Sequence, residues 1–245
     1  MTGSQAPTAH RPPLSGSAFI RLLAALDDAP TATAQDAFAA ALSRWVDWTD
    51  AISLSAALDS PPEAGIGASA AALRADEREV ARVRAALRKT IAQDGNGRTS
   101  RPELRTAPPP EPADDDFEPW RERYLGAQRA MDANIGPLRR RVRSTLAGAS
   151  PEMARLAAVD GVMEQVVGGR ERALLAGVAT RLAQRFETLR ARHEATPDDP
   201  DTPRPPVRWP DTFGQEMRDV LAAELDFRMQ PVEGLLEALR RSADQ

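Results

Sequence analysis

The sequence predicts an all-α protein, in which a long antiparallel helical hairpin over about residues 117–194 is completed by a C-terminal helix. Shorter N-terminal helices and disordered Pro-rich linkers make up the rest. Three observations favour this fold class. Apolar residues form 42% of the 245-residue chain but aromatic residues only 4%, and alanine, which supplies much of the apolar share, is the strongest helix former. No segment alternates apolar and polar residues over the length of a strand. The prolines gather in a few clusters, so long stretches can be helical.

An N-terminal helical region is expected over residues 16–93, after a disordered lead over residues 1–15. Its first helix is short. Ser15 or Ser17 caps it, and it ends near Pro30 because the residue before a proline is disfavoured in a helix. The apolar face of this helix consists of Phe19, Leu22, Leu23 and Leu26.

Two longer helices follow, over about residues 33–58 and 70–93. Both repeat their core-type residues at steps of three and four, which is typical of a helix with one buried face. The buried face of the second helix is expected to be Phe38, Leu42, Trp45, Thr49 and Ile52. That of the third is expected to be Leu73, Val80, Val83, Leu87 and Ile91. The other face of the third helix is dense in Arg, Asp and Glu, and we expect it to be solvated.

Two segments are expected to be flexible linkers, over residues 94–115 and 196–208. The first contains Asp94-Gly95-Asn96-Gly97 and Pro108-Pro109-Pro110, and the second is rich in Pro and Asp. Such compositions do not build packed elements.

The hairpin region is expected over residues 116–195. Its first arm repeats apolar residues at steps of three, four or seven, close to the seam of a helix packed along its length on another helix. This seam is Phe117, Trp120, Tyr124, Met131, Ile135, Leu138, Val142 and Leu146. Gly136-Pro137 lies inside the arm, where we expect a kink rather than an end.

A turn at Gly148 to Pro151 leads into the second arm, because Gly ends one helix, Ser150 caps the next and Pro151 takes its first position. The second arm is expected to run unbroken to about residue 194. Its seam is Met153, Leu156, Met163, Val167, Leu174, Val178, Leu182, Phe186 and Leu189. Gly168-Gly169 is its weak point, since each glycine costs about 1 kcal/mol relative to alanine.

The region 209–245 is expected to form a C-terminal helix that packs on the hairpin. Pro231 is expected to kink or divide it. Its apolar set is Phe213, Met217, Val220, Leu221, Leu225, Val232, Leu235, Leu236 and Leu239.

Composition and motifs exclude or disfavour several functions. The chain has no cysteine, which excludes disulfides, thiolate catalysis and Cys-based metal sites. The net charge of −4 gives the whole chain no pull on nucleic acid. Neither histidine, His10 or His193, belongs to a metal-ligand motif, so no cofactor, metal or catalytic residue is expected. A cytoplasmic location is expected, because residues 1–16 lack the apolar core of a signal peptide and no segment resembles a membrane span.

The first candidate interaction site is a pair of tryptophans flanked by acids, Trp45, Asp47, Trp48 and Asp50. Residues three apart on a helix share a face, so these side chains can form a binding surface. The alternative is a buried tryptophan stripe with its polar flank in solvent, and this reading is favoured.

The second candidate site is a basic cluster, Arg139, Arg140, Arg141 and Arg143. Guanidinium forks suit phosphate, but no helix-turn-helix pattern surrounds the cluster and acidic segments balance its charge. Ion pairing within the chain or with a partner is favoured, and binding of nucleic acid or a lipid headgroup is the alternative.

Charged residues also lie at or beside core positions of the second arm, namely Asp160 and Arg170. A buried charge must be paired, and Arg139 to Arg143 on the facing arm are candidate partners of Asp160 or Glu164. These charged residues either set the register of the hairpin or form a partner site, or they lie at its boundary with their charged groups in water.

An ordered set of short motifs resembles a bacterial family of about 250 residues known only as a domain of unknown function. The motifs are Trp45-Val46-Asp47-Trp48-Thr49-Asp50-Ala51, Leu54-Ser55-Ala56-Ala57-Leu58, Gln128-Arg129-Ala130-Met131, Leu156-Ala157-Ala158-Val159-Asp160, Arg170-Glu171-Arg172-Ala173-Leu174-Leu175, Ala223-Glu224-Leu225-Asp226 and Gln230-Pro231-Val232-Glu233-Gly234-Leu235-Leu236. The resemblance carries over no activity and no functional residue. It implies genes near those for MotA/TolQ/ExbB-type and OmpA-like envelope proteins, and hence a cytoplasmic accessory of an envelope complex.

The function expected from the sequence is therefore a non-enzymatic helical scaffold or adaptor that acts through protein–protein contacts. Its expected partner is a protein, with a membrane complex at its cytoplasmic face as one candidate and a second copy of the chain as another. The alternative is a nucleic-acid-binding protein that uses the Arg139–Arg143 cluster.

Overall fold

A computed structural model describes residues 18–26, 48–59, 70–94, 116–195 and 208–243. Each of these ranges is helical and none contains a strand, which confirms the all-α prediction. The predicted linkers and the N-terminal lead lie almost wholly outside the described residues, as does the first part of the predicted second helix.

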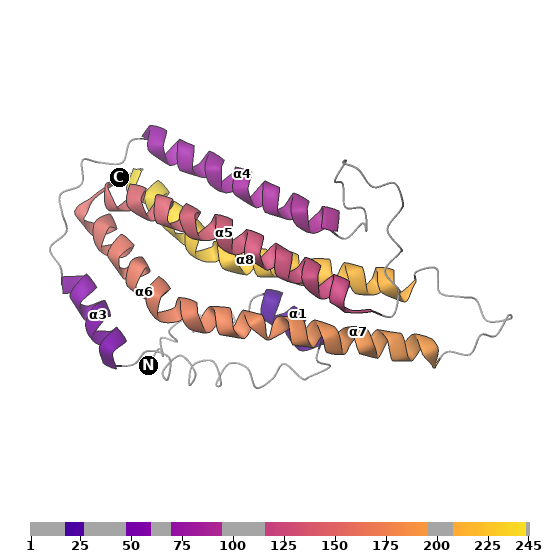
Figure 1. The fold of residues 1–245 in the computed structure, drawn as a ribbon. Helices are drawn as coiled ribbons and strands as arrows, with labels where there is room; N and C mark the ends of the chain where they lie inside the picture. Colours follow the sequence, from indigo (N-terminus) through magenta and orange to yellow (C-terminus); the bar gives the residue numbers. More distant parts are fainter. Residues whose placement is uncertain (1–17, 27–47, 60–69, 95–115, 196–207, 244–245) are drawn as a thin grey trace, which may run out of the picture.

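The main bundle is formed by α5 (Glu118–Ala147), α6 (Pro151–Ala176), α7 (Val178–Glu194) and α8 (Trp209–Ala243) (Figure 1). α5 and α6 form the predicted hairpin. The turn between them is capped as expected, since the Ser150 hydroxyl accepts a hydrogen bond of 3.2 Å from the backbone N–H of Met153.

The second arm reaches Glu194 as predicted and forms one long bent helix. A single turn residue, Gly177, lies between α6 and α7, and its backbone stays in the helical region (φ −70°, ψ −17°). α6 runs through Gly168-Gly169 and is bent along its length in Figure 1. Adjacent glycines are a recognised cause of such a bend, so the predicted weak point lies in the bent helix rather than at its end.

Prolines inside the two longest helices do not divide them. α5 continues through Pro137 and α8 through Pro231. Both helices bury an extended apolar stripe, so tertiary packing outweighs the hydrogen bond that each proline removes.

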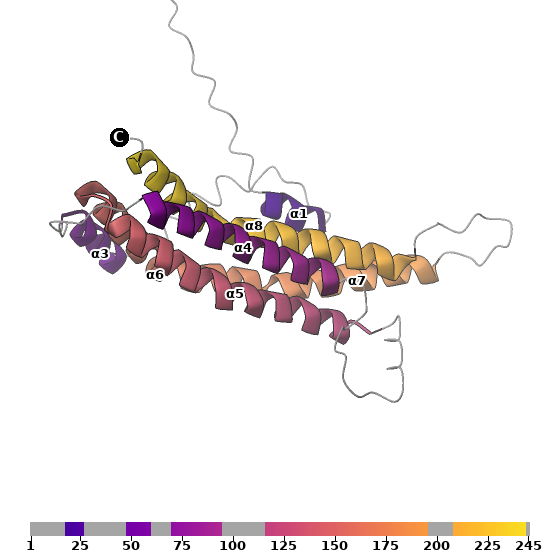
Figure 2. The same ribbon diagram turned by 90° about the horizontal axis from the view of Figure 1, so that it is seen from above.

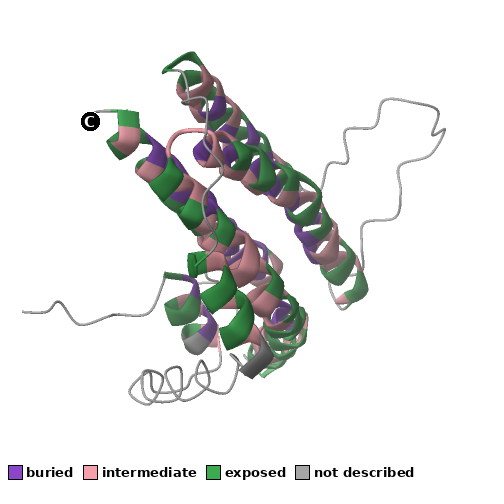
Figure 3. Ribbon diagram, turned by 90° about the vertical axis from the view of Figure 1, so that its left-hand side faces the viewer, coloured by how far each residue is buried: buried purple, intermediate pink, exposed green. Residues whose placement is uncertain are grey.

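α8 lies at the centre of the core, and all nine of its predicted apolar positions are buried. All eight positions predicted for the first arm lie in this core or pack against it. Seven of them belong to α5, and the eighth, Phe117, is the residue before α5 begins. The long helices carry buried residues on one side and exposed residues on the other (Figure 3).

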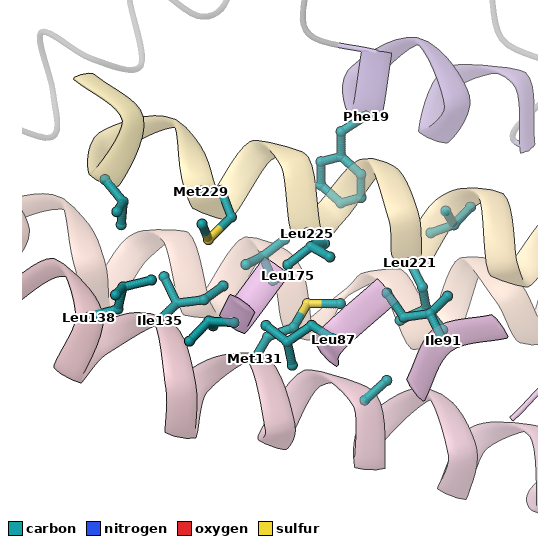
Figure 4. Packing of buried hydrophobic residues seen from close by; sticks show 14 of the residues in the cluster. Phe19, Leu87, Ile91, Met131, Ile135, Leu138, Leu175, Leu221, Leu225 and Met229 are labelled. Atoms are coloured by element: carbon teal, nitrogen blue, oxygen red, sulfur yellow. The ribbon is translucent and has the colours of Figure 1, made fainter. Parts of the chain in front are cut away.

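The N-terminal helices pack on this bundle. α1 (Ala18–Leu26) lies against α7 and α8, and α4 (Ala70–Asp94) lies along α5 and α8 (Figures 1 and 2). Phe19 stacks on Phe227 with ring centroids 5.7 Å apart. Leu87 and Ile91 of α4 enter the same core as Met131 of α5 (Figure 4).

α3 (Trp48–Asp59) is placed differently, since it packs on α6 at the outside of the bundle (Figure 1). None of its residues whose burial is described is buried. The residues of α3 whose burial is described therefore contribute nothing to the central core.

No helix in the described ranges is both long enough and apolar enough to cross a bilayer.

Candidate interaction surface

Two arginines of the predicted basic cluster turn toward α6. Arg139 donates to both carboxylate oxygens of Asp160, from Nε at 3.1 Å and from Nη2 at 2.6 Å. Arg143 donates from Nε to Asp160 at 2.8 Å and also binds Glu164. Burial lowers the pKa of Arg143, but its hydrogen bonds with Glu164 and Asp160 outweigh that effect and raise the pKa above its ordinary value. The predicted pairing of this cluster with Asp160 or Glu164 is therefore present.

The other two arginines of the cluster, Arg141 and Arg140, lie outside the α5–α6 interface. Arg141 donates from Nε to Oδ1 of Asp76 on α4 at 2.7 Å. Asp76 is buried, and its Oδ2 has no hydrogen-bond partner within the described part of the chain. Arg140 is exposed. Three of the four guanidinium groups thus bind carboxylates of the same chain.

The prediction that the outer face of the third helix is wholly solvated is wrong for Asp76. The carboxylate is only 1% exposed, because α4 lies along α5 and brings Asp76 to Arg141. Asp76 and Arg141 are 65 residues apart in the sequence, so no local sequence pattern predicts their ion pair.

A buried polar network joins α5 and α8, and sequence reasoning missed it. Glu224 is fully buried and accepts hydrogen bonds from the Tyr124 hydroxyl at 2.6 Å, from Gln128 Nε2 at 3.0 Å and from Arg228 Nε at 2.8 Å. Arg228 also donates to Asp132 at 2.5 Å. The available signal was the position of Glu224, three residues after Leu221 on the buried face of α8.

The network changes the ionisation of its members. Burial raises the pKa of the Tyr124 phenol well above its ordinary range, and the charge and hydrogen bond of Glu224 raise it further. Burial also raises the pKa of Glu171 on α6, against the opposing effect of Arg228 and Arg139. The pKa values of these groups on α5, α6 and α8 therefore depend on one another through the interior of the bundle.

The side of α6 that faces α5 carries small and charged residues. Asp160 and Glu164 bind the arginines of α5, and a side chain at Gly161 would contact Arg143. Ala157 and Leu175 are the buried apolar residues of this helix. Long arginine side chains reach across to α6, which leaves α5 at an angle after the turn (Figure 1).

The predicted seam of the second arm is therefore wrong for Leu156 and Leu174 of α6, although Met153 packs against the core and α7 buries Val178, Leu182 and Phe186 as expected. Leu156 is 39% exposed and Leu174 61% exposed. The physical reason is that leaving the carboxylates of Asp160 and Glu164 unpaired would cost more free energy than exposing the two leucines. The charged side of α6 therefore faces α5.

The displaced residues form an apolar stripe on α6, defined here as Leu156, Met163, Val167 and Leu174. Leu156 and Leu174 are 18 residues apart, which is five complete helical turns, so the two side chains lie on one line along the helix. Met163 and Val167 lie within about 20° of that line and are half-buried. α6 packs mainly on α5 and α3, and it also contacts α7 and α8.

The first candidate site is only partly described. Trp45 and Asp47 lie outside the described residues. Trp48 and Asp50 begin α3, and Asp50 is half-buried. α3 packs on α6, so the described end of this candidate site lies beside α6.

Among the described residues, no group of three or more acidic or histidine side chains is placed to hold a metal ion. His193 lies beside the ring of Trp209, with centroids 6.5 Å apart.

Comparison with known proteins gives one match. The family model described as "Protein of unknown function (DUF3348)" matches residues 5–241. No curated protein and no solved structure matches the chain.

Proposed function

We propose that this chain, which belongs to the DUF3348 family, is a non-enzymatic helical scaffold or adaptor that binds another protein through the outer surface of α6 and α3. The observation that carries the proposal is the apolar stripe of α6. Contiguous apolar surface on a folded protein is a recognised mark of a protein–protein contact. Its partner class is a protein, with an envelope complex contacted at its cytoplasmic face as the candidate implied by the family resemblance.

The exposed apolar residues of the described helices support this location. Four of the five large exposed side chains, Ile52, Leu58, Leu156 and Leu174, belong to α3 and α6. The fifth, Ile20, is on α1. The helices of the main core place their large apolar residues inside, so the exposed apolar side chains of the described residues are concentrated on α3 and α6.

The ion pairs of the basic cluster favour a scaffold over a nucleic-acid-binding protein. Arg139 and Arg143 are 15% and 19% exposed and bind Asp160. A phosphate would have to displace that carboxylate. The nucleic-acid alternative predicts binding that weakens steeply with salt and is lost when Arg139, Arg140 and Arg141 are changed to alanine.

The test is affinity capture of the tagged full chain from its own cells in mild detergent, with the bound proteins identified. Three proteins are compared: wild type, Leu156→Arg/Leu174→Arg, and the control Ala158→Arg/Ala176→Arg. The control adds the same charges with the same 18-residue spacing at exposed positions, about 200° around the helix from the stripe.

The proposal predicts that wild type and control recover the same partner and that the stripe variant loses it. Recovery of an envelope-complex protein would identify the partner class. Equal recovery by all three proteins would contradict the role of the stripe, and recovery of nucleic acid that depends on the arginines would support the alternative.

A further inference from the structure

The outward side of α4 carries positive charge and, among the side chains that are described, no negative charge. This side lies opposite the buried Val83 and Leu87. Every exposed residue of α4 whose burial is described is alanine, arginine, lysine or glutamine. The basic face of α4 is defined here as six exposed residues within about 100° of one another around the helix, namely Arg74, Arg78, Ala81, Arg82, Ala85 and Lys89.

The carboxylates of α4 turn toward the neighbouring helices instead. Asp76 is buried against Arg141 of α5. The half-buried Glu77 accepts a hydrogen bond of 2.7 Å from Nε of Arg240 of α8. The sequence predicted one solvated face of mixed charge for this helix, whereas the structure separates the two signs. Basic partners on α5 and α8 take up the carboxylates and leave the arginines of α4 outside.

Three of the four basic side chains of this face have no carboxylate beside them. Arg82 binds Glu79 of the same helix at 2.6 Å. In the described part of the chain, Arg78 donates to the backbone oxygen of Arg74 at 3.1 Å, and neither of these two arginines nor Lys89 binds a carboxylate. The three arginines follow one another at steps of four residues, and like charges at this spacing destabilise a helix. A negatively charged partner would remove that repulsion.

The basic face is open to solvent and suits a helix. Among the described helices, α5 and α8 pack on α4, and Figure 1 shows α4 at the upper edge of the bundle with both of them below it. Ala81 and Ala85 lie in the middle of the face, where small side chains allow a second helix to approach closely. No residue of α4 described as exposed is aromatic or a large aliphatic, so the face offers neither a stacking surface for bases nor an apolar anchor for a bilayer.

We propose that the basic face of α4 is a second protein-binding surface, and that its partner is an acidic α-helix of another protein. The face extends about 22 Å from Arg74 to Lys89, so a helix of about 16 residues covers it. Carboxylates at steps of three and four residues on that helix would form charge-assisted hydrogen bonds with the basic side chains.

This surface is separate from the apolar stripe of α6. Arg139 binds Asp160 of α6 and Arg141 binds Asp76 of α4, and these two arginines lie about 160° apart around α5. α4 and α6 therefore pack on opposite sides of α5. The inference goes beyond the proposed function and does not depend on the stripe, and a chain with both surfaces joins two proteins.

The experiment measures binding of the full chain to a fluorescent three-heptad helical peptide by anisotropy at low ionic strength. The probe has glutamate at heptad e and g positions and alanine elsewhere, and the control peptide has glutamine in place of glutamate. The variant Arg74→Gln/Arg78→Gln/Lys89→Gln removes the three basic side chains that lack a carboxylate. A short DNA duplex and vesicles that contain phosphatidylserine are tested as competing anions.

Two further variants are the controls. Arg129→Gln/Arg155→Gln/Arg172→Gln removes the same charge from exposed positions of α5 and α6. Ala81→Gln/Ala85→Gln keeps the charge of the basic face and places larger side chains where the partner helix would pack.

The expected result is that the wild type binds the glutamate peptide at least roughly tenfold more tightly than the glutamine peptide. The triple variant of α4 loses this preference, the triple variant of α5 and α6 keeps it, and the alanine variant binds the glutamate peptide several-fold more weakly. If the α4 variant loses helicity by circular dichroism, Arg78→Gln alone makes the same comparison.

Four results would overturn the inference. They are equal binding of the two peptides, equal losses in both triple variants, no effect of the alanine substitutions, and tighter binding of DNA or vesicles than of the glutamate peptide. Failure of the proposed function is a separate outcome. Leu156→Arg/Leu174→Arg disrupts the stripe alone, so this variant should bind the glutamate peptide as the wild type does, and a loss of binding would place the peptide on the stripe instead.

Discussion

The buried network around Tyr124 makes a quantitative prediction about stability at alkaline pH. Tyr124 is the single tyrosine of the chain, Lys89 is its single lysine and cysteine is absent, so few other side chains titrate between pH 9 and 12. Burial and the neighbouring Glu224 raise the pKa of the phenol far above its unfolded value of about 10. The folded protein keeps the proton that the unfolded chain releases.

The sign of the effect follows from this difference. A group whose pKa is higher in the folded state stabilises fully below its unfolded pKa, and that stabilisation is lost as pH rises above it. One proton corresponds to about 1.4 kcal/mol per pH unit. Because the unfolded tyrosine is already half ionised at pH 10, the free energy of unfolding should fall by about 2.3 kcal/mol between pH 10 and pH 12.

The matched variant is Tyr124→Phe. Removing the hydroxyl leaves Glu224 without the donor at 2.6 Å and should cost about 1–3 kcal/mol at neutral pH. The variant should lack the alkaline slope, so the two stability curves converge as the pH rises. The assay is urea denaturation followed by circular dichroism at each pH, with tyrosinate absorbance as the direct readout of ionisation. Equal slopes for both proteins, or a tyrosinate signal near pH 10 in the folded wild type, would refute the reasoning.

Three further predictions concern α6 and α8. Asp160→Ala leaves the largely buried Arg139 guanidinium without its carboxylate and leaves Arg143 with Glu164 alone, and it should lower the free energy of unfolding by about 3 kcal/mol or more. Glu164→Ala should lower the free energy of unfolding by under about 1 kcal/mol, since that carboxylate is 31% exposed. If urea denaturation gave similar losses of stability for Asp160→Ala and Glu164→Ala, the result would be inconsistent with the burial of Asp160. Gly214→Ala places a Cβ 3.1 Å from the Trp120 ring and should lower stability by about 1–3 kcal/mol, whereas Gly169→Ala meets no atom within 4 Å and should raise it by up to about 1 kcal/mol. A thermal melt in which Gly214→Ala is as stable as wild type would contradict the close packing of α8 on α5.

The sequence predicted the helices that have one unambiguous apolar face. α8 is the clearest case, since steps of three and four from Phe213 to Leu239 left only one side to bury. Ser150 and Pro151 likewise determined the start of α6, because their side chains act on the adjacent backbone. Local chemistry and a strong period are sufficient where one face is apolar and the other charged.

The same reasoning failed for α6 because this helix has two usable sides. Its apolar stripe had the spacing of a seam, but Asp160 and Glu164 lie on the side that meets α5. Which side turns inward depends on Arg139 and Arg143, about 20 residues away in sequence. Hydrophobic periodicity predicts that a helix has an apolar stripe, but it does not predict what packs against that stripe.

The candidate sites were predicted in part. The ion pairing of the arginine cluster was anticipated from the rule that buried charges need partners, but the split of Arg141 toward Asp76 depends on how α4 docks. Glu224 was overlooked because a charged residue within an apolar face reads as a boundary position. Its partners Tyr124 and Gln128 come from another helix.

The central claim is that α6 turns its charged side to α5 and leaves an apolar stripe available for a partner. The absence of cysteine allows a direct test, in which Leu174→Cys and Leu175→Cys are each labelled with a maleimide in the folded full chain. The account predicts rapid labelling at position 174, which is 61% exposed, and protection at the neighbouring position 175, which is 4% exposed. Protection at 174 with rapid labelling at 175 would restore the seam that the sequence predicted and contradict the proposed binding surface.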